Sequence, residues 1–337
     1  MRFITPLLMS IGIAATAASA GESSLSARVT QADGWVTYRV PIAANAGAPC
    51  CYDWREKRRA GCALDDGSWN IGNDDAPGAL GDDALDVYLR VEHGKLVKAR
   101  AYASSCVVEG AAGLRRLEGV DAAESVAMLA KAANASATDD MNAAESELAA
   151  MALHRDSSAT QALVDLASAS HPRRLREQSL FWLGQMRGAV GAAAVERAAT
   201  SDPDAQLRAN AVFALSQARG ADDAYASIAR IARDDASEHV RGQALFWMAQ
   251  MNDSRAQNDI VAAIRAEHSG EVREQAVFAL SQLKDDRAAA ALIALVRGDY
   301  PRSVKERALF WLGQSGSPAA LAFLDEVLSK GTGATSK

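Results

Sequence analysis

From residue 140 onward, hydrophobic and polar positions recur in blocks that resemble one another at a fixed spacing. Each block contains a phenylalanine inside an apolar stretch and a glutamine four residues later. The phenylalanines are Phe181, Phe213, Phe246, Phe278 and Phe310, so the steps are 32, 33, 32 and 32 residues. A period of about 20–50 residues is typical of a solenoid, in which each repeat buries its apolar face against its neighbours.

Within each repeat the apolar residues follow a helical period and predict two helices. The first helix carries the phenylalanine, and the second is rich in alanine. A residue that can begin a helix stands nine positions before each phenylalanine. These residues are Pro172, Asp204, Ser237, Ser269 and Pro301. Proline suits the first helical turn, and Asp or Ser can cap the helix. A degenerate unit over 145–168 has the same spacing, so we expect about six units over 140–329 and a flexible tail over 330–337.

A different pattern, typical of strands, precedes these repeats. Residues 35–40 mix aromatic and β-branched side chains and end at Pro41. Residues 85–92 and 95–103 are two extended runs joined by His93-Gly94, which predicts a β-hairpin. We therefore expect a small β-containing domain over 21–118, and the fold class is mainly α, a right-handed α-solenoid preceded by this β-rich domain.

Two segments of this first part connect its predicted elements. Residues 65–83 are rich in Asp, Gly and Asn but lack the register of a calcium-binding loop, so we interpret them as a solvated loop. Residues 119–139 are interpreted as a helix over 122–133, capped by Asp121, followed by a linker.

The first twenty residues have the pattern of a signal peptide. Arg2 precedes an apolar run, and Ala18-Ser19-Ala20 is a small-residue cleavage signature. We expect cleavage before Gly21 and an exported protein, periplasmic or secreted, with no transmembrane segment after signal removal. A retained N-terminal anchor is the alternative.

The cysteines agree with export, because an even number in an exported segment indicates disulfides. They are Cys50, Cys51, Cys62 and Cys106. A bridge between adjacent cysteines is strained, which leaves Cys50–Cys62 with Cys51–Cys106, or Cys50–Cys106 with Cys51–Cys62. A zinc site is the alternative, but the usual knuckle spacing is missing, and no C-x-x-C redox motif occurs.

The repeated helix places its residues on distinct faces. Leu175, Ser179 and Leu183 share the face that we expect to pack on the second helix. Large Trp182, Trp247 and Trp311 alternate with small Ala214 and Ala279, which predicts interlocking packing between adjacent repeats. We expect the second helices to build the concave face of the solenoid.

Phenylalanine and glutamine lie on the face opposite that seam, one turn apart. We call this set the Phe/Gln strip: Phe181, Gln185, Phe213, Gln217, Phe246, Gln250, Phe278, Gln282, Phe310 and Gln314. It is either a structural ladder, in which glutamine amides bond along the stack, or a surface that docks a partner. A run of exposed aromatic side chains is unusual in a monomer unless it serves an interaction.

A file of basic residues also recurs: Arg176, Arg208, Arg241, Arg273 and Lys305. We expect these residues to pair with carboxylates on the same helices, such as Glu177, Glu274 and Glu306, or with the turns between repeats. An anion-binding groove is a minor alternative. The chain has a formal net charge of −6 and a pI of about 5.5, which disfavours nucleic-acid binding.

The pattern Val-Arg-x-x-Ala-x-x-x-Leu-Gly, followed by a turn and an Ala/Leu helix, resembles the HEAT-like repeat of the phycobilisome-lyase type. The alternation of Phe-Trp-Leu-Gly-Gln with Phe-Ala-Leu-Ser-Gln is similar to that of exported bacterial HEAT-repeat proteins. The resemblance covers 140–329 and implies a binding scaffold. HEAT-type iron hydroxylases use repeated His-Glu pairs as metal ligands, whereas here Glu238-His239 and Glu267-His268 have the reverse order and lie 29 residues apart, off the repeat.

No catalytic, metal-binding or cofactor-binding motif is found in the sequence. We therefore expect a non-enzymatic protein without cofactor that binds a protein or peptide partner of unknown identity, with its oligomeric state open. Two alternatives remain: a structural or assembly protein whose N-terminal domain does the recognition, and an enzyme whose site lies in that domain.

Overall fold

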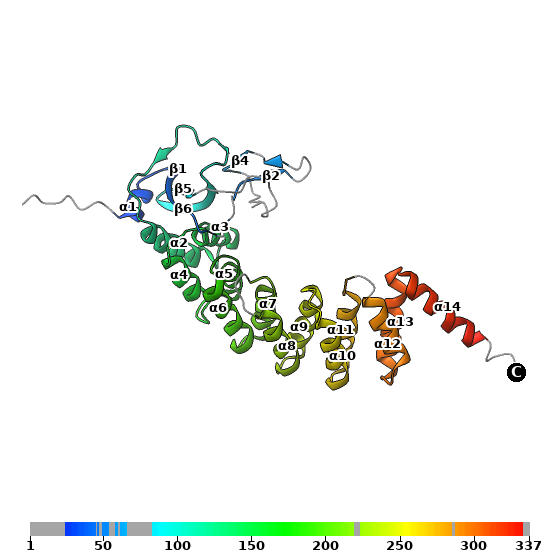
Figure 1. The fold of residues 1–337 in the computed structure, drawn as a ribbon. Helices are drawn as coiled ribbons and strands as arrows, with labels where there is room; N and C mark the ends of the chain where they lie inside the picture. Colours follow the sequence, from blue (N-terminus) through cyan, green and yellow to red (C-terminus); the bar gives the residue numbers. More distant parts are fainter. Residues whose placement is uncertain are drawn as a thin grey trace, which may run out of the picture.

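The computed structural model describes residues 24–44, 46, 49–53, 58–59, 61–65, 83–218, 223–284 and 287–332. The expected signal peptide and cleavage point, most of the loop predicted over 65–83, and the end of the predicted tail lie outside the described residues. Figure 1 shows a β-containing part at the N-terminal end, from which pairs of helices extend as a curved array toward the C-terminus.

The principal sheet of the β-containing part has four strands in the order β6-β5-β1-β8. They are β1 (Gly34–Pro41), β5 (Ala84–Glu92), β6 (Lys95–Ala103) and β8 (Arg115–Arg116). β5 lies antiparallel to β1 and to β6, while β8 pairs with β1 in parallel. The predicted hairpin is confirmed, and His93 and Gly94 both have positive φ (52° and 74°), as a tight primed turn requires.

Two short strand pairs carry the cysteines beside this sheet. β2 (Tyr52–Asp53) pairs with β3 (Arg58–Arg59), and β4 (Cys62–Ala63) pairs with β7 (Val108–Glu109). Cys50 is bonded to Cys106 and Cys51 to Cys62, which selects one of the two pairings compatible with the sequence. None of the four cysteines is left as a thiol, so they provide no zinc site.

Helix α2 (Ala122–Ser136) begins at the predicted cap, where the Asp121 side chain accepts a hydrogen bond from the Glu124 backbone N–H. It ends at Ser136, three residues later than predicted, so the first part of the segment that we interpreted as linker is helical. α2 packs on the next two helices, α3 (Met141–Ala152) and α4 (Ser158–Leu166). The predicted degenerate repeat is therefore a helix pair covered at its N-terminal side by α2 and the short α1 (Leu25–Thr30).

The β-containing part and the helices share one hydrophobic core. α3 is buried on nearly every side, since it packs against β6 as well as against α2 and α5. The Ala43 backbone N–H also donates to the Leu153 carbonyl at the end of α3. The sheet thus covers the first end of the helical array, where a solenoid would otherwise expose apolar surface.

The remaining helices form the five pairs that the phenylalanine period predicts. In chain order they are α5 (Arg173–Met186) with α6 (Gly188–Ser201), α7 (Ala205–Ser216) with α8 (Ala224–Asp234), α9 (Glu238–Gln250) with α10 (Ala256–Ala266), α11 (Gly270–Ser281) with α12 (Arg287–Arg297), and α13 (Arg302–Ser315) with α14 (Pro318–Thr332). Leu175, Ser179 and Leu183 are fully buried, which agrees with the predicted packing face of α5.

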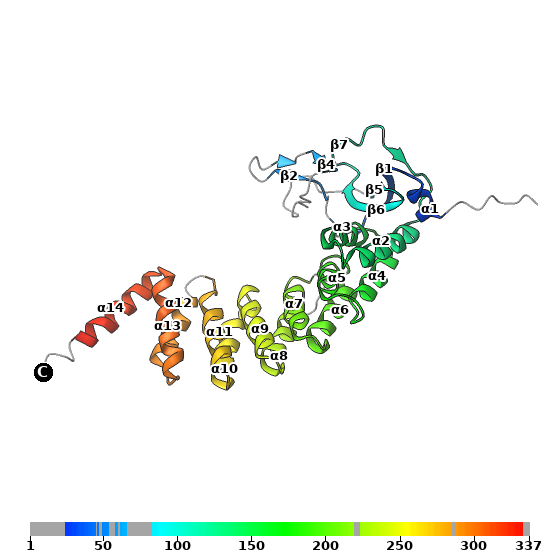
Figure 2. The same ribbon diagram turned by 180° about the vertical axis from the view of Figure 1, so that it is seen from behind.

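The direction of curvature differs from the prediction. The first helices α5, α7, α9 and α11 lie on the inner side of the arc, and the second helices α6, α8 and α10 lie on its outer side (Figures 1 and 2). Successive first helices pack closely on one another, whereas the second helices α6, α8, α10 and α12 touch one another only sparsely. An array curves toward its more closely packed layer, so the expectation that the second helices build the concave face is wrong.

Candidate binding surface on the first helices

The phenylalanines of the Phe/Gln strip lie on the first helices, on the face turned away from the second helices. Phe213 and Phe310 are exposed, at 37% and 51%, while the other three are half-buried. Because the first helices line the inner side of the arc, the Phe/Gln strip follows that inner side (Figure 1).

Six rings contact one another in an unbroken series, which we call the aromatic row: Phe213, Trp247, Phe246, Phe278, Trp311 and Phe310. Within it, Trp247 contacts Phe213 of the preceding repeat with ring centroids 4.7 Å apart. Phe246 stacks on Phe278 at 5.9 Å with planes 7° apart. Offset and tilted ring contacts of this kind stabilise beyond the burial of their area.

The tryptophans belong to this surface, which the sequence reasoning missed. We expected them to fill space opposite alanines, but Trp247 and Trp311 each lie between a phenylalanine of their own repeat and that of the preceding repeat. Trp182 contacts only Phe181 among the aromatic contacts of the described chain. The sequence feature that could have indicated this role is the alternation of Phe-Trp with Phe-Ala, which places one tryptophan at every second junction between repeats.

The glutamines do not build an amide ladder in the part of the chain that the structure describes. The Gln185 amide donates to the backbone carbonyl of Gln217 in the next repeat, at 3.3 Å. The amides of Gln217 and Gln282 donate to the adjacent serine hydroxyls. Gln250 and Gln314 are exposed, so the inner side carries polar amides beside its aromatic rings.

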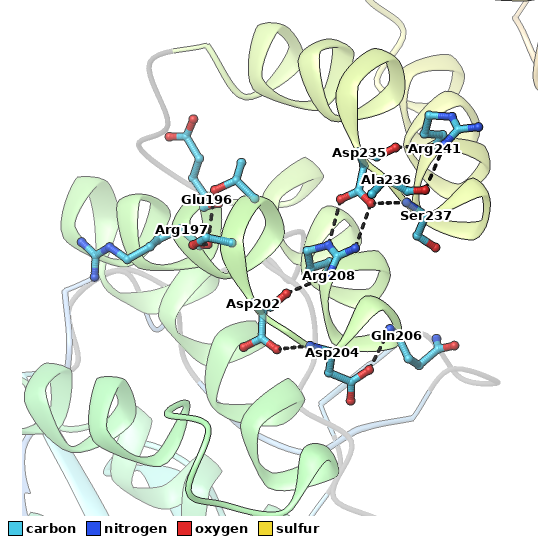
Figure 3. A network of polar contacts seen from close by, with 12 residues as sticks. Glu196, Arg197, Asp202, Asp204, Gln206, Arg208, Asp235, Ala236, Ser237 and Arg241 are labelled. Atoms are coloured by element: carbon cyan, nitrogen blue, oxygen red, sulfur yellow. Dashed lines mark hydrogen bonds and ion pairs between the residues drawn. The ribbon is translucent and has the colours of Figure 1, made fainter. Parts of the chain in front are cut away.

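The basic file connects the turns between repeats, which confirms one of the two predicted arrangements. Arg208 donates to both carboxylate oxygens of Asp235 in the following turn, at 2.8 and 2.9 Å, and to the carbonyl of Asp202 in the preceding turn (Figure 3). Arg241 makes the equivalent contacts one repeat later, with Glu267 and with the Asp235 carbonyl. Arg176 pairs with Asp202 in the same way.

The ion pairs of Arg176, Arg208 and Arg241 are largely buried, so these three guanidinium groups are not available to an anion. The Asp235 carboxylate also accepts a hydrogen bond at 2.8 Å from the backbone N–H of Ser237, the residue directly before α9 (Figure 3). Burial alone would raise the pKa of Asp235, but the hydrogen bonds from Arg208 and Ser237 outweigh it and hold that pKa below its usual range. The Asp235 carboxylate therefore stays charged, and the file serves to fix the spacing of the repeats.

A series of buried, hydrogen-bonded side chains connects β1 to α2 and to the end of α3, and the sequence pattern did not indicate it. Tyr38 Oη lies 2.6 Å from Ser125 Oγ, which lies 2.9 Å from His154 Nε2. His154 Nδ1 donates to the Ala150 carbonyl at 2.9 Å, so Nε2 accepts from Ser125. All three side chains are fully buried, so substrate has no access to this Tyr-Ser-His arrangement. Its role is to orient β1, α2 and α3.

Two kinds of feature are absent from the described residues. The described residues contain no group of three or more His, Cys, Asp or Glu side chains that could hold a metal ion. Among the same residues, no helix is both long enough and apolar enough to span a bilayer.

Comparison with known proteins identifies the repeats. The family model for HEAT repeats matches residues 225–311, and that for the PBS lyase HEAT-like repeat matches 304–330. A search of curated proteins found none that matches this sequence. Among solved structures, human deoxyhypusine hydroxylase in complex with glycerol is similar, with 17% identity over 60% of this chain and 77% of that one. The TM-score is 0.26, which carries no argument about function.

Proposed function

We propose, from the HEAT repeats over 225–330 and the aromatic row, that this chain is a non-catalytic scaffold of the cell envelope that binds a protein or peptide along the inner side of its array. The observation that carries the proposal is the exposure of Phe213 and Phe310 at the two ends of the aromatic row. Aromatic side chains flanked by polar amides are typical of the central part of protein interfaces.

The geometry supports this proposal in a second way. The rings are already held in place by one another and by the helices, so a partner that covers them does not have to order them first. Preorganised surfaces lose less conformational entropy on binding, which favours affinity. The ion pairs between turns keep the repeats in register and so keep the row continuous.

Two other functions predict different outcomes for a binding experiment with variants of the inner side. In a structural or assembly role, recognition would lie in the β-containing part, and variants on the inner side would leave binding unchanged. An enzyme would need a reactive side chain at an accessible site. Tyr38 of the β-containing part is fully buried, together with its helical partners Ser125 and His154.

We expect Phe310→Ser to change the free energy of unfolding by no more than about 0.5–1 kcal/mol, because the ring is half in solvent. The double variant Phe213→Ser/Phe310→Ser should reduce capture of envelope proteins at least tenfold, since interfacial aromatic residues dominate binding energy. Capture is measured by quantitative mass spectrometry on the immobilised full chain. Val190→Ser is the matched control, because Val190 is 65% exposed on the outer helix α6. Identical retained sets for the double variant and the control would contradict docking on the inner side.

Export is part of the proposal and has its own test. The mature chain should begin at Gly21 and retain both disulfides. Its intact mass under non-reducing conditions should lie about four hydrogens below that of the reduced form, because each disulfide removes two. A mature N-terminus at Met1, or four free thiols in protein isolated from cells, would contradict export.

A further inference from the structure

A hollow of about 480 Å³ opens between the outer helices α8 and α10, with the inner helix α9 behind it. Small side chains explain why it is there: Ala229 and Ala232 of α8 face Ala263 of α10 across it. Met248 lies at its base, and Arg233 and His268 lie at its rim. Its volume lies within the range of ligand-binding pockets in proteins, about 300–1,000 Å³.

The next junction along the array shows what fills such a space. Because α10 and α12 repeat α8 and α10 at 32 residues, Ala229, Ala232 and Ala263 correspond to Val261, Ile264 and Leu295. Ile264 and Leu295 are buried, so larger apolar side chains replace the alanines there.

The turn at that junction supplies an aromatic ring as well. Tyr300 occupies the position equivalent to His268, and Arg265 occupies that of Arg233. The Arg265 guanidinium lies 5.4 Å from the centre of the Tyr300 ring, and its Nε donates to the phenol oxygen at 2.9 Å. The ring lies against Gly298, where a side chain would clash with it. At this junction the Tyr300 ring and the Arg265 side chain thus occupy the position that is open at the hollow.

At the hollow the arginine is present and the ring is missing. Arg233 is 68% exposed and, in the described chain, forms its ion pair with the adjacent Asp234. The two carboxylates nearby are engaged: Glu267 with Arg241, and Asp259 with the Tyr225 hydroxyl at 2.8 Å. The rim therefore offers a cation, and a cation attracts the negative face of an aromatic ring.

We propose that this hollow binds a tyrosine side chain of another polypeptide, whose ring lies over the Arg233 guanidinium and beside the Ala266 methyl group. The site lies on the outer layer and shares no residue with the aromatic row. It is therefore independent of binding along the inner side, and either site can fail its test while the other passes.

The test uses the full chain labelled with ¹³C at the methionine methyl groups, with N-acetyl-tyrosinamide as the probe. We expect the Met248 methyl resonance to shift on titration, because a ring bound beside it perturbs its field. The affinity should be at least fivefold higher than for N-acetyl-leucinamide, which has similar bulk but no ring. No shift at Met248, or equal affinity for the two compounds, would overturn the proposal.

Three variants separate the site from adventitious binding. Ala263→Leu/Ala266→Gly/His268→Tyr copies the next junction into the hollow, including the glycine that leaves room for the ring, and should abolish the shift. Arg233→Ala removes only an exposed cation, so the protein should fold normally and bind the tyrosine probe about fivefold more weakly. Ala322→Leu adds the same bulk on an exposed position of α14 and should leave binding unchanged. Undiminished binding in Arg233→Ala would refute the stacking geometry even if the filled variant proved unstable.

Discussion

Trp247→Ala should lower the free energy of unfolding by about 2–4 kcal/mol, because it removes a large half-buried ring between two repeats. The indole contacts Phe213 of one repeat and Phe246 of its own, at 4.7 and 5.1 Å between ring centres. In a repeat array the stability is nearly a sum of local terms and nearest-neighbour terms. Removal of this ring weakens the interface between the second and third pairs that carry a phenylalanine. Urea denaturation followed by circular dichroism measures the loss.

Trp182→Ala provides the matched control for that result. Trp182 is half-buried as well, but its ring contact in the described chain is with Phe181 of the same helix. Its loss should therefore cost less, about 1–2 kcal/mol, because no ring contact between repeats is broken. Equal losses for the two variants would show that burial alone, and not the aromatic row, accounts for the stability. A loss well below 1 kcal/mol for Trp247→Ala would make it a binding residue instead.

Glu147→Gln should stabilise the protein above neutral pH by about 2–3 kcal/mol and have little effect at pH 4. Glu147 lies on α3 with its side chain fully buried, and neither carboxylate oxygen has a hydrogen-bond partner of good geometry. Burial raises its pKa from 4.5 to about 7, and the nearby Ser136 hydroxyl only partly offsets this. The protonated form is thus favoured in the folded state. Its contribution to stability is complete below pH 4.5 and is lost as the pH rises through 7.

The contribution of His154 to stability depends on pH in the opposite way. Burial lowers its pKa from 6.5 to about 4, so the folded state favours the neutral ring that accepts from Ser125. This contribution is complete above pH 6.5 and is lost as the pH falls toward 4. The two effects oppose each other between pH 4.5 and 6.5 in the native sequence. In Glu147→Gln this opposition is removed, and the His154 effect has the same sign as that of carboxylates with a lowered pKa, such as Asp235, so stability should rise steadily with pH over that range. A flat profile in the variant would contradict these assignments.

The sequence by itself determined the features that depend on local chemistry or on the period. The 32-residue spacing, the caps such as Asp121, and the turn at His93-Gly94 all require particular residue types at particular positions, so they could be predicted and are confirmed. The same holds for the five helix pairs from α5 to α14, because each of them carries one phenylalanine block. The HEAT-like resemblance rests on these same residues and agrees with the repeats matched over 225–330.

The cysteine pairing shows where local reasoning stops. Two pairings satisfied the geometry of a disulfide. The one that forms agrees with a long-range contact at the end of β6, where the Ala103 backbone N–H donates to the Pro49 carbonyl at 3.2 Å and so brings Cys106 near Cys50. No spacing along the chain contains that information. The buried chain from Tyr38 through Ser125 to His154 is similar, since its members come from three elements up to 116 residues apart.

Only the tertiary structure decided which layer of helices is concave and what each tryptophan contacts. Helical periodicity assigns a residue to a face of its own helix, but curvature depends on how closely neighbouring helices pack, which is a property of two surfaces. The same reason applies to the hollow beside Arg233. The sequence contains its three alanines and its arginine, and only the packing of α8 on α10 shows that they surround a space that Tyr300 fills one repeat later.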